Sequence, residues 1–133
     1  MSKWQIVSIT REAAKQVASL FEDPNVKAEI ERILRLIADR ELPVKDFTTE
    51  TSEKIYVAHL EIDAPNWYRV KILKFWIRIA FRLLVVRNDK LIELEHGELP
   101  DSDERYLDII WAGYKTDMTY REIRRIHKKM HPK

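Results

Sequence analysis

The spacing of apolar residues changes part-way along the chain, and it predicts helices first and strands afterwards. A short apolar segment, 4–9, has the length of a strand. Apolar side chains then recur every three or four residues over 11–21 and 24–40, which is typical of amphipathic helices. Because so few residues separate the two segments, we expect an antiparallel helical hairpin. Helix-start residues precede both segments: Thr10, and Asp23 followed by Pro24.

From residue 54 apolar and polar side chains alternate, as in strands. The alternation predicts four strands, at 55–62, 67–72, 76–86 and 91–96. Gly97 and Pro100 end the last strand, and helices are expected at 103–114 and at 119–130, where Thr119 and Glu122 form a capping-box pattern. The order predicts one α+β domain over 1–133. We expect an N-terminal strand and helical hairpin packed on an antiparallel sheet, followed by two C-terminal helices: a core of 1–100 and an extension of 101–133.

The strand pair 67–72 and 76–86 is expected to have one apolar and one basic face. Alternation places Ile77, Ile79 and Phe81 on the face that the helical hairpin can cover. Arginine and lysine bind phosphates and indole rings stack on unpaired bases, so the opposite face predicts an RNA-binding platform. Its side chains, with Lys74 from the intervening turn, are Trp67, Arg69, Lys71, Trp76, Arg78 and Arg82.

The same face admits a second interpretation, in which its charges neutralise one another. In the strand 91–96, Ile92 and Leu94 belong to the core, so Glu93 and Glu95 fall on the basic face. Cross-strand pairs of arginine and glutamate would account for these charges without a ligand. The sequence leaves both interpretations open.

Net charge is only +2, but the charges are unevenly spread. Residues 54–87 and 109–133 each hold 7 basic and 2 acidic side chains, whereas 88–108 hold 2 basic and 8 acidic ones. Basic blocks can attract phosphate groups even in a nearly neutral chain. The second basic block contains the predicted helix 119–130, whose cations extend the predicted nucleic-acid surface: Arg121, Arg124, Arg125 and Lys128.

Composition narrows the chemistry further. There is no cysteine, which excludes disulfides, thiol nucleophiles and Cys-ligated metals. Only two glycines and no zinc-type histidine spacing are present, so we expect no metal and no cofactor. The amino terminus lacks an apolar leader and the stretch 70–86 contains four cations, so we expect a cytoplasmic protein without a membrane partner. The 35% of charged residues is typical of thermophilic proteins.

Three runs in the predicted strands form a recognisable pattern: Tyr68-Arg69-Val70-Lys71-Ile72, Ile77-Arg78-Ile79-Ala80-Phe81 and Lys90-Leu91-Ile92-Glu93-Leu94-Glu95-His96. These runs resemble the RelE/ParE superfamily of toxin–antitoxin toxins. With the upstream strand and helical hairpin, the resemblance covers about residues 4–106. It implies a compact microbial RNase fold, an antitoxin-like protein partner and, in the RelE branch, metal-independent cleavage of mRNA on the ribosome through the ribose 2′-hydroxyl.

The resemblance also implies roles for individual residues. Glu93 or Glu95 would be the general base and His96 the acid. Tyr106 would take the place of the family's C-terminal tyrosine. The scissile phosphate would be held and neutralised by Arg69, Lys71, Arg78 and Arg82.

The chain departs from the family pattern in three places. The turn Leu73-Lys74-Phe75 is bulky, residues 98–104 are acidic where the family is basic, and a helical extension follows. Two hypotheses result. The first is a RelE/ParE-like protein acting on RNA, as a ribosome-dependent mRNA endoribonuclease or a degenerate relative. The second is a non-catalytic RelE-like module that binds nucleic acid or a protein partner.

Overall fold

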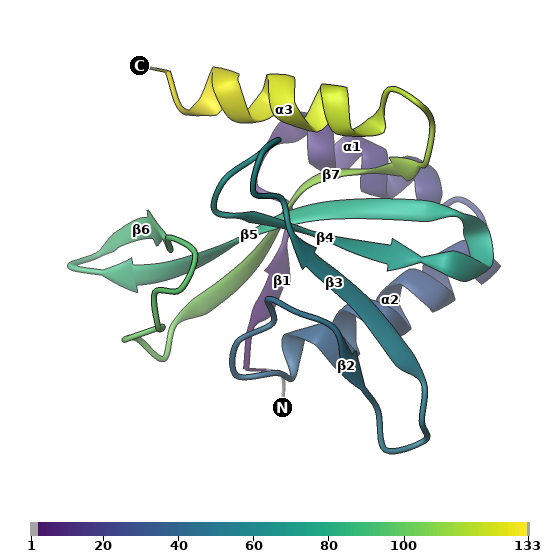
Figure 1. The fold of residues 1–133 in the computed structure, drawn as a ribbon, viewed down its shortest axis with the longest axis horizontal. Coiled ribbons are helices and arrows are strands. Elements are labelled where there is room, and N and C mark those ends of the chain that lie inside the picture. Colours follow the sequence, from purple (N-terminus) through teal and green to yellow (C-terminus); the bar gives the residue numbers. More distant parts are fainter. Residues whose placement is uncertain (1–2, 133) are drawn as a thin grey trace.

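The computed structural model describes residues 3–132 (Figure 1). Within these residues the chain forms three α-helices and a curled, seven-stranded sheet, in agreement with the α+β prediction. One turn of 3-10 helix, Leu73–Phe75, joins β4 to β5. In chain order the elements are β1 (Gln5–Val7), α1 (Arg11–Leu20), α2 (Pro24–Ala38), β2 (Phe47–Thr48), β3 (Lys54–His59), β4 (Trp67–Ile72), β5 (Ile77–Arg87), β6 (Lys90–Glu93), β7 (Arg105–Tyr114) and α3 (Thr119–Met130).

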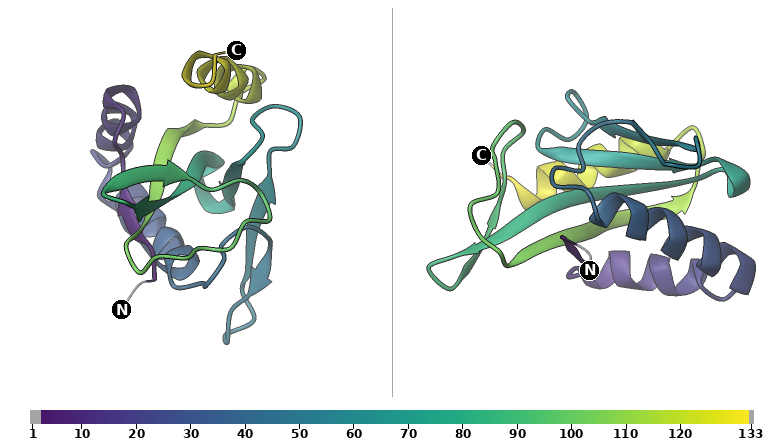
Figure 2. Two further views of the ribbon diagram at one scale, coloured as in Figure 1. Left: turned by 90° about the vertical axis from the view of Figure 1, so that its left-hand side faces the viewer. Right: turned by 90° about the horizontal axis from the view of Figure 1, so that it is seen from below.

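The sheet is built around β5, the longest strand. Its order is β1-β7-β5-β4-β3-β2, with β1 parallel to β7 and the other pairings antiparallel. One edge of β5 pairs with β7, while the other edge pairs first with β4 and then with β6. Asn88 and Asp89 adopt positive φ between β5 and β6, the backbone of a two-residue hairpin turn. The sheet curls along its length (Figure 2).

The N-terminal helices cover one face of the sheet. Oγ1 of Thr10 accepts a hydrogen bond from the backbone N of Ala13 (3.4 Å), and Oδ1 of Asp23 accepts one from that of Asn25 (2.9 Å). These caps start α1 and α2. The main core lies between these helices and the sheet, and its fully buried members include Ile30, Ile37, Val70, Ile77, Ile79, Phe81 and Leu83.

Residues 105–114 form strand β7, so the predicted helix over 103–114 is wrong. β7 pairs with β5 on one edge and with β1 on the other. Ile109 is buried in the main core, whereas Ile110 and Trp111 are buried on the opposite face. A strand covered on both faces has a continuous apolar run, which sequence periodicity does not distinguish from a buried helix. One helix therefore follows the sheet, where two were predicted.

Helix α3 has the predicted bounds but not the predicted capping box. Its N-cap is Met118, and Oγ1 of Thr119 accepts a hydrogen bond from the backbone N of Thr116 (2.8 Å). α3 packs on the second face of the sheet, with Ile123 fully buried. No helix among residues 3–132 has the length and apolarity needed to cross a membrane. The second apolar cluster beneath α3 contains Leu60, Ala64, Trp67, Ala80, Ile110 and Trp111.

Candidate nucleic-acid interface

The register of β4 and β5 places the predicted basic side chains on one face of the sheet. Trp67 pairs with Arg82 and Lys71 pairs with Arg78, while Arg69 lies between them on β4. Side chains opposite one another in an antiparallel pair point to the same face. α3 crosses this second face, and the cations on it fall into two groups with different partners.

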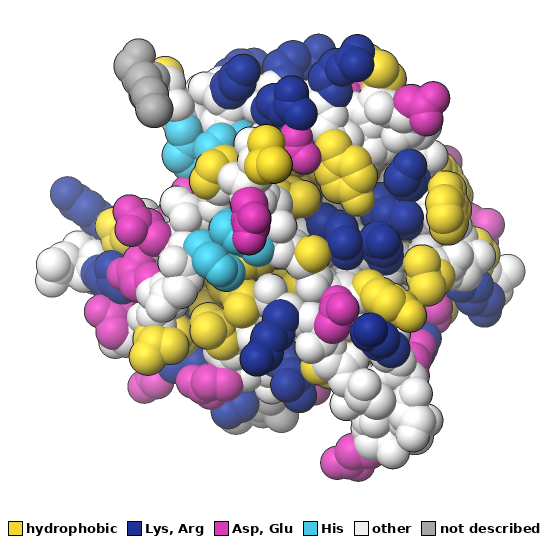
Figure 3. Space-filling view, viewed as in Figure 1, with side chains coloured by type: hydrophobic (Ala, Val, Ile, Leu, Met, Phe, Trp, Pro, Cys, Tyr) yellow, Lys and Arg dark blue, Asp and Glu magenta, His cyan; other side chains and the backbone are white. Residues whose placement is uncertain are grey.

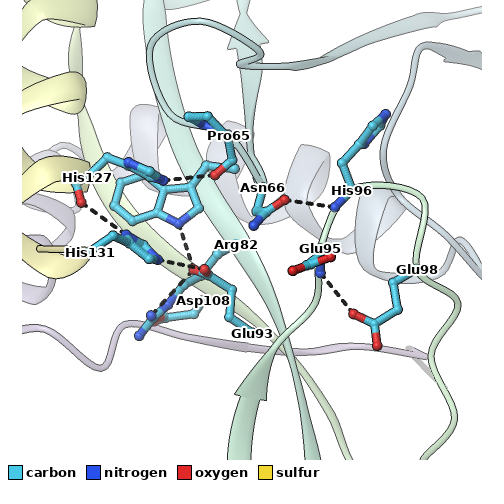
Figure 4. Close-up of polar contacts among 11 residues, drawn as sticks. Pro65, Asn66, Arg82, Glu93, Glu95, His96, Glu98, Asp108, His127 and His131 are labelled. Atoms are coloured by element: carbon cyan, nitrogen blue, oxygen red, sulfur yellow. Dashed lines mark hydrogen bonds and ion pairs between the residues drawn. The ribbon is translucent and has the colours of Figure 1, made fainter. Parts of the chain in front are cut away.

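Arg82 belongs to a neutralised group. Its Nε donates to Oδ2 of the fully buried Asp108 (2.8 Å), and its Nη1 lies 3.6 Å from Oε1 of Glu93. Glu93 also accepts a hydrogen bond from Nε1 of Trp67 (2.7 Å), and its Oε2 lies 2.7 Å from Nε2 of His131 (Figure 4). The expected pairing of Glu93 with the arginine face is therefore present. Both carboxylate oxygens of Glu93 are engaged.

Trp67 lies inside the protein rather than on the predicted stacking surface. Its side chain is fully buried, and the rings of His127 and His131 from α3 meet it edge-on at 4.8 and 5.8 Å. Nε2 of His127 lies 2.8 Å from the carbonyl oxygen of Pro65, which fixes the last turns of α3 over the indole. With α3 in this position, no base can stack on Trp67.

The second group of cations lines an open pocket. Arg69, Lys71 and Arg78 are joined there by Lys115, which follows β7, and the pocket encloses about 460 Å³. Residues 58–63 and Tyr120 of α3 form its other walls. None of the four cations makes an ion pair with any residue in 3–132. In Figure 3 Lys and Arg side chains gather over the sheet below α3. We call this site the cation pocket.

Two nitrogen atoms of the cation pocket are buried without a hydrogen-bond partner in the described structure: Nη1 of Arg69 and Nε of Arg78. Arg78 is only 2% exposed. Its Nη1 donates to the carbonyl oxygen of Ile77 (3.1 Å), and its guanidinium group lies 4.8 Å from the ring centre of Trp76. A buried donor of a charged group costs free energy when no acceptor meets it. The positive charge beneath the pocket is thus only partly met by protein oxygens.

The cations of the pocket act on one another. The positive charge of Arg69, followed by burial and by Arg78, lowers the pKa of Lys71, and Lys115 adds a smaller effect in the same direction. The negative charge of Asp46 raises the pKa of Lys71, but this effect is smaller than the lowering by Arg69, by burial or by Arg78. Like charges that lower a lysine pKa disfavour the unliganded, fully protonated pocket. An anion bound among them would offset that cost.

Exposed aromatic rings lie at the same end of the sheet. Trp76 is 55% exposed and Tyr114 is 53% exposed. The backbone N of Lys115 donates to the carbonyl oxygen of Trp76 (2.9 Å), which holds Trp76 against the end of β7. Tyr114 pairs with the core residue Ile77, so its side chain points to the opposite face of the sheet. Lys74, in the turn before β5, is also exposed. Trp76 is therefore accessible beside the cation pocket, whereas Lys74 lies over the ring of Phe75 (5.5 Å).

Glu95 and His96 do not line the cation pocket. Glu95 is exposed beyond the end of β6, and the backbone N of His96 donates to Oδ1 of Asn66 (2.9 Å) (Figure 4). The ring of His96 stacks on His59 with centroids 3.7 Å apart, and its Nδ1 lies 3.0 Å from the hydroxyl of Tyr68. Burial, followed by the charge of His96, lowers the pKa of His59, and burial raises the pKa of Tyr68 to about 12. These contacts form a cluster that adjoins the cation pocket through His59.

Tyr106 is the most distant of the predicted catalytic residues. It pairs with Leu84 on β5, whereas Arg78 lies six residues earlier on that strand. At about 3.3 Å per residue this separation is roughly 20 Å. The hydroxyl of Tyr106 donates to Oε2 of Glu104 (2.8 Å). The predicted catalytic set is therefore spread over four places on the molecule.

The outer face of α3 provides a second basic surface. Arg124 contacts Oδ1 of Asp63 through Nη2 (2.6 Å), which joins the helix to the wall of the cation pocket. A band of Lys and Arg side chains follows α3 in Figure 3. All four predicted residues of this surface are exposed: Arg121, Arg124, Arg125 and Lys128.

Sequence reasoning missed Lys115, Tyr120 and Asp108. Lys115 and Tyr120 reach the pocket only because β7 and α3 bring them to the second face. The run of β-branched and aromatic residues at 106–114 was the available signal, since it favours a strand. As a strand it would have placed Asp108 opposite Arg82. Within residues 3–132 no group of three or more His, Asp or Glu side chains is arranged to hold a metal ion.

Comparison of the chain with protein-family models, with curated proteins and with solved structures finds no match. The site has two main features, which are the cation pocket and the exposed indole of Trp76 at its edge.

Proposed function

We propose that this protein binds single-stranded RNA through the cation pocket and the outer face of α3, without cleaving it. The four cations of the pocket, which make no ion pair with any described residue, carry the proposal. Other cations on this face do have counter-ions, because Arg82 is paired with both Asp108 and Glu93. Phosphate oxygens are acceptors of the charge and geometry that unpaired arginine and lysine side chains bind.

The exposed indole of Trp76 favours a single strand. Trp76 is 55% exposed, and its ring centre lies 4.8 Å from the guanidinium group of Arg78 in the pocket. Every base has a π face, so stacking on such rings contributes about 1–3 kcal/mol per base with little sequence preference. Bases of a duplex are already stacked on each other. The cations of α3 continue the basic surface from the pocket wall at Asp63.

The positions of the acid–base candidates favour binding over cleavage. Both oxygens of Glu93 are engaged, by Arg82, Trp67 and His131. Tyr106 lies roughly 20 Å along the sheet from Arg78 at strand spacing. A general base must come within hydrogen-bond reach of the proton that it removes. A strand held in the cation pocket would not meet that condition with either residue.

We also propose a relation to the RelE/ParE superfamily. Its support is the order β1-α1-α2 followed by antiparallel strands, together with the arginine-bearing pair β4 and β5. An antitoxin-like protein partner belongs to the same proposal. The proposed RNA binding does not depend on this relation.

Fluorescence anisotropy with a labelled 12-nucleotide RNA tests binding. We expect affinity to fall with salt, with a log–log slope of about −0.7 for each phosphate contacted on a single strand. The double variant Lys71→Gln/Lys115→Gln should weaken binding and make the slope shallower by about 1.4. Lys15→Gln/Lys90→Gln removes the same charge from exposed positions outside the pocket and should behave as the wild type. Salt-independent or undetectable RNA binding would overturn the proposal.

Cleavage is tested separately with end-labelled mRNA, both free and on translating ribosomes. We expect the labelled mRNA to remain intact. Cleavage, or growth arrest on expression, that is lost in Arg78→Ala/Arg82→Ala would show an active endoribonuclease and contradict the non-catalytic part of the proposal.

A further inference from the structure

The charge of the cation pocket exceeds what one link of an RNA strand can neutralise. Four cations converge there, and of the two carboxylates in its walls, Asp63 is held by Arg124 while Glu61 is 79% exposed and points toward His59 at 3.9 Å. A phosphodiester carries a single negative charge. A phosphate monoester carries about −1.5 to −2 at pH 7 and offers three strong acceptor oxygens.

The donors of the pocket are also fixed in place. The guanidinium group of Arg78 is held between the carbonyl oxygen of Ile77 and the indole of Trp76. Its Nε and Nη1 of Arg69 have no acceptor in the described structure. Donors that are positioned before the ligand arrives lose little conformational entropy on binding. A compact, highly charged group gains most from such a site.

The remaining walls of the pocket are suited to the nucleoside that carries a phosphate monoester. Leu60 and Ile62 give the segment 58–63 an apolar character, and the ring of Tyr120 faces the pocket from α3. A volume of about 460 Å³ has room for more than a phosphate group, and it lies within the range of small-molecule sites, about 300–1,000 Å³. One nucleotide of a strand can therefore enter with its phosphate.

We infer that the cation pocket binds the terminal phosphate monoester of an RNA strand, so that the protein recognises phosphorylated ends. The inference rests on the proposed RNA-binding function and names the part of the strand that the pocket takes. The rest of the strand then runs across Trp76 or along α3. Charge alone does not distinguish a 5′-phosphate from a 3′-phosphate, and the experiment separates them.

Anisotropy is measured at fixed salt with one internally labelled 10-nucleotide RNA in three forms: hydroxyl at both ends, 5′-phosphate only and 3′-phosphate only. We expect one phosphorylated form to bind at least about tenfold more tightly than the hydroxyl form, which is about 1.4 kcal/mol. The preference should disappear in Lys71→Gln/Lys115→Gln and persist in Lys15→Gln/Lys90→Gln. Thermal melts confirm that each variant is folded.

Failure of the inference and failure of the proposed function give different results. Equal affinity for all three forms would overturn end recognition while leaving RNA binding in place. No binding of any form at low salt would overturn the proposed function and the inference together. A preference for phosphorylated RNA that persists in Lys71→Gln/Lys115→Gln would show that the terminal phosphate binds outside the cation pocket. That result would also overturn the inference.

Discussion

Oδ2 of Asp108 lies 2.8 Å from Nε of Arg82, and this buried pair separates a neutralised part of the second face from an unpaired one. Oδ1 of Asp108 accepts a hydrogen bond from the backbone N of Ile9 (2.9 Å). One side chain of β7 thus joins β5 to the chain that follows β1. Arg78, only four residues before Arg82, has no such partner in the described structure.

Replacing Asp108 by alanine should strongly destabilise the fold. The change leaves Arg82 without its closest counter-ion, and removing one partner of a buried pair typically costs about 3–5 kcal/mol. Urea denaturation measures the free energy of unfolding. Asp103→Ala, at an exposed position, is the matched control. A loss below about 1 kcal/mol in Asp108→Ala would contradict a structural role for the pair.

Trp76 allows stability and binding to be tested at one position. Its φ of 57° is left-handed, a region that asparagine tolerates and β-branched residues avoid. The free energy of unfolding of Trp76→Val should therefore be about 1–2 kcal/mol lower than that of Trp76→Asn, as measured by denaturant titration. Both variants should bind the single strand more weakly, because the stacking surface is gone. Unchanged RNA affinity in Trp76→Asn would exclude the indole from the interface.

Stability should decrease as the pH falls from 7.5 to 5.5. Burial lowers the pKa of His59 in the folded state, so the unfolded chain takes up a proton at a higher pH than the native protein does. The stability that neutral His59 contributes is full above about pH 6.5 and is lost as the pH falls through its folded pKa.

Thermal melts across this pH range check the expectation, with His59→Phe as the comparison. His127 also has a lowered pKa, chiefly through burial. The dependence of stability on pH should therefore be weaker in His59→Phe than in the wild type, but it should not disappear. An identical pH dependence in wild type and His59→Phe would show that His59 is not responsible.

Lys71→Gln should stabilise the unliganded protein at pH 7. The charges of Arg69 and Arg78, with burial, lower the pKa of Lys71, so its protonated form is disfavoured in the native state. The cost is fully present below the folded pKa and is relieved as the pH rises through that value towards 10.5. We expect a gain of at most about 1 kcal/mol in urea denaturation. A gain no larger than that of Lys15→Gln would show that the cations of the pocket do not repel one another.

The local elements of the fold could be predicted because their signals lie within the elements themselves. Thr10 and Asp23 start α1 and α2, and the turn at Asn88 and Asp89, where φ is positive, falls between the predicted strands 76–86 and 91–96. Periodicity alone did not separate β7 from a helix, because β7 is covered on both faces and so lacks a period of two.

The candidate site was predictable where it depends on strand pairing. Alternation placed Arg69, Lys71 and Arg78 on one face and brought Glu93 towards the arginines. The burial of Trp67 was not predictable, because it depends on where α3 lies, and a helix end can dock on either face of a sheet. Lys115 entered the site for the same reason.

The exposure of Trp76 gives the protein an optical reporter. Trp4 and Trp67 are fully buried and Trp111 is 5% exposed, so a collisional quencher such as iodide reaches one indole of the four. That indole lies 4.8 Å from the guanidinium group of Arg78 at the floor of the cation pocket. Ligand entry should therefore change the quenchable fraction of the intrinsic emission, and occupancy can be followed in the unmodified protein without a dye.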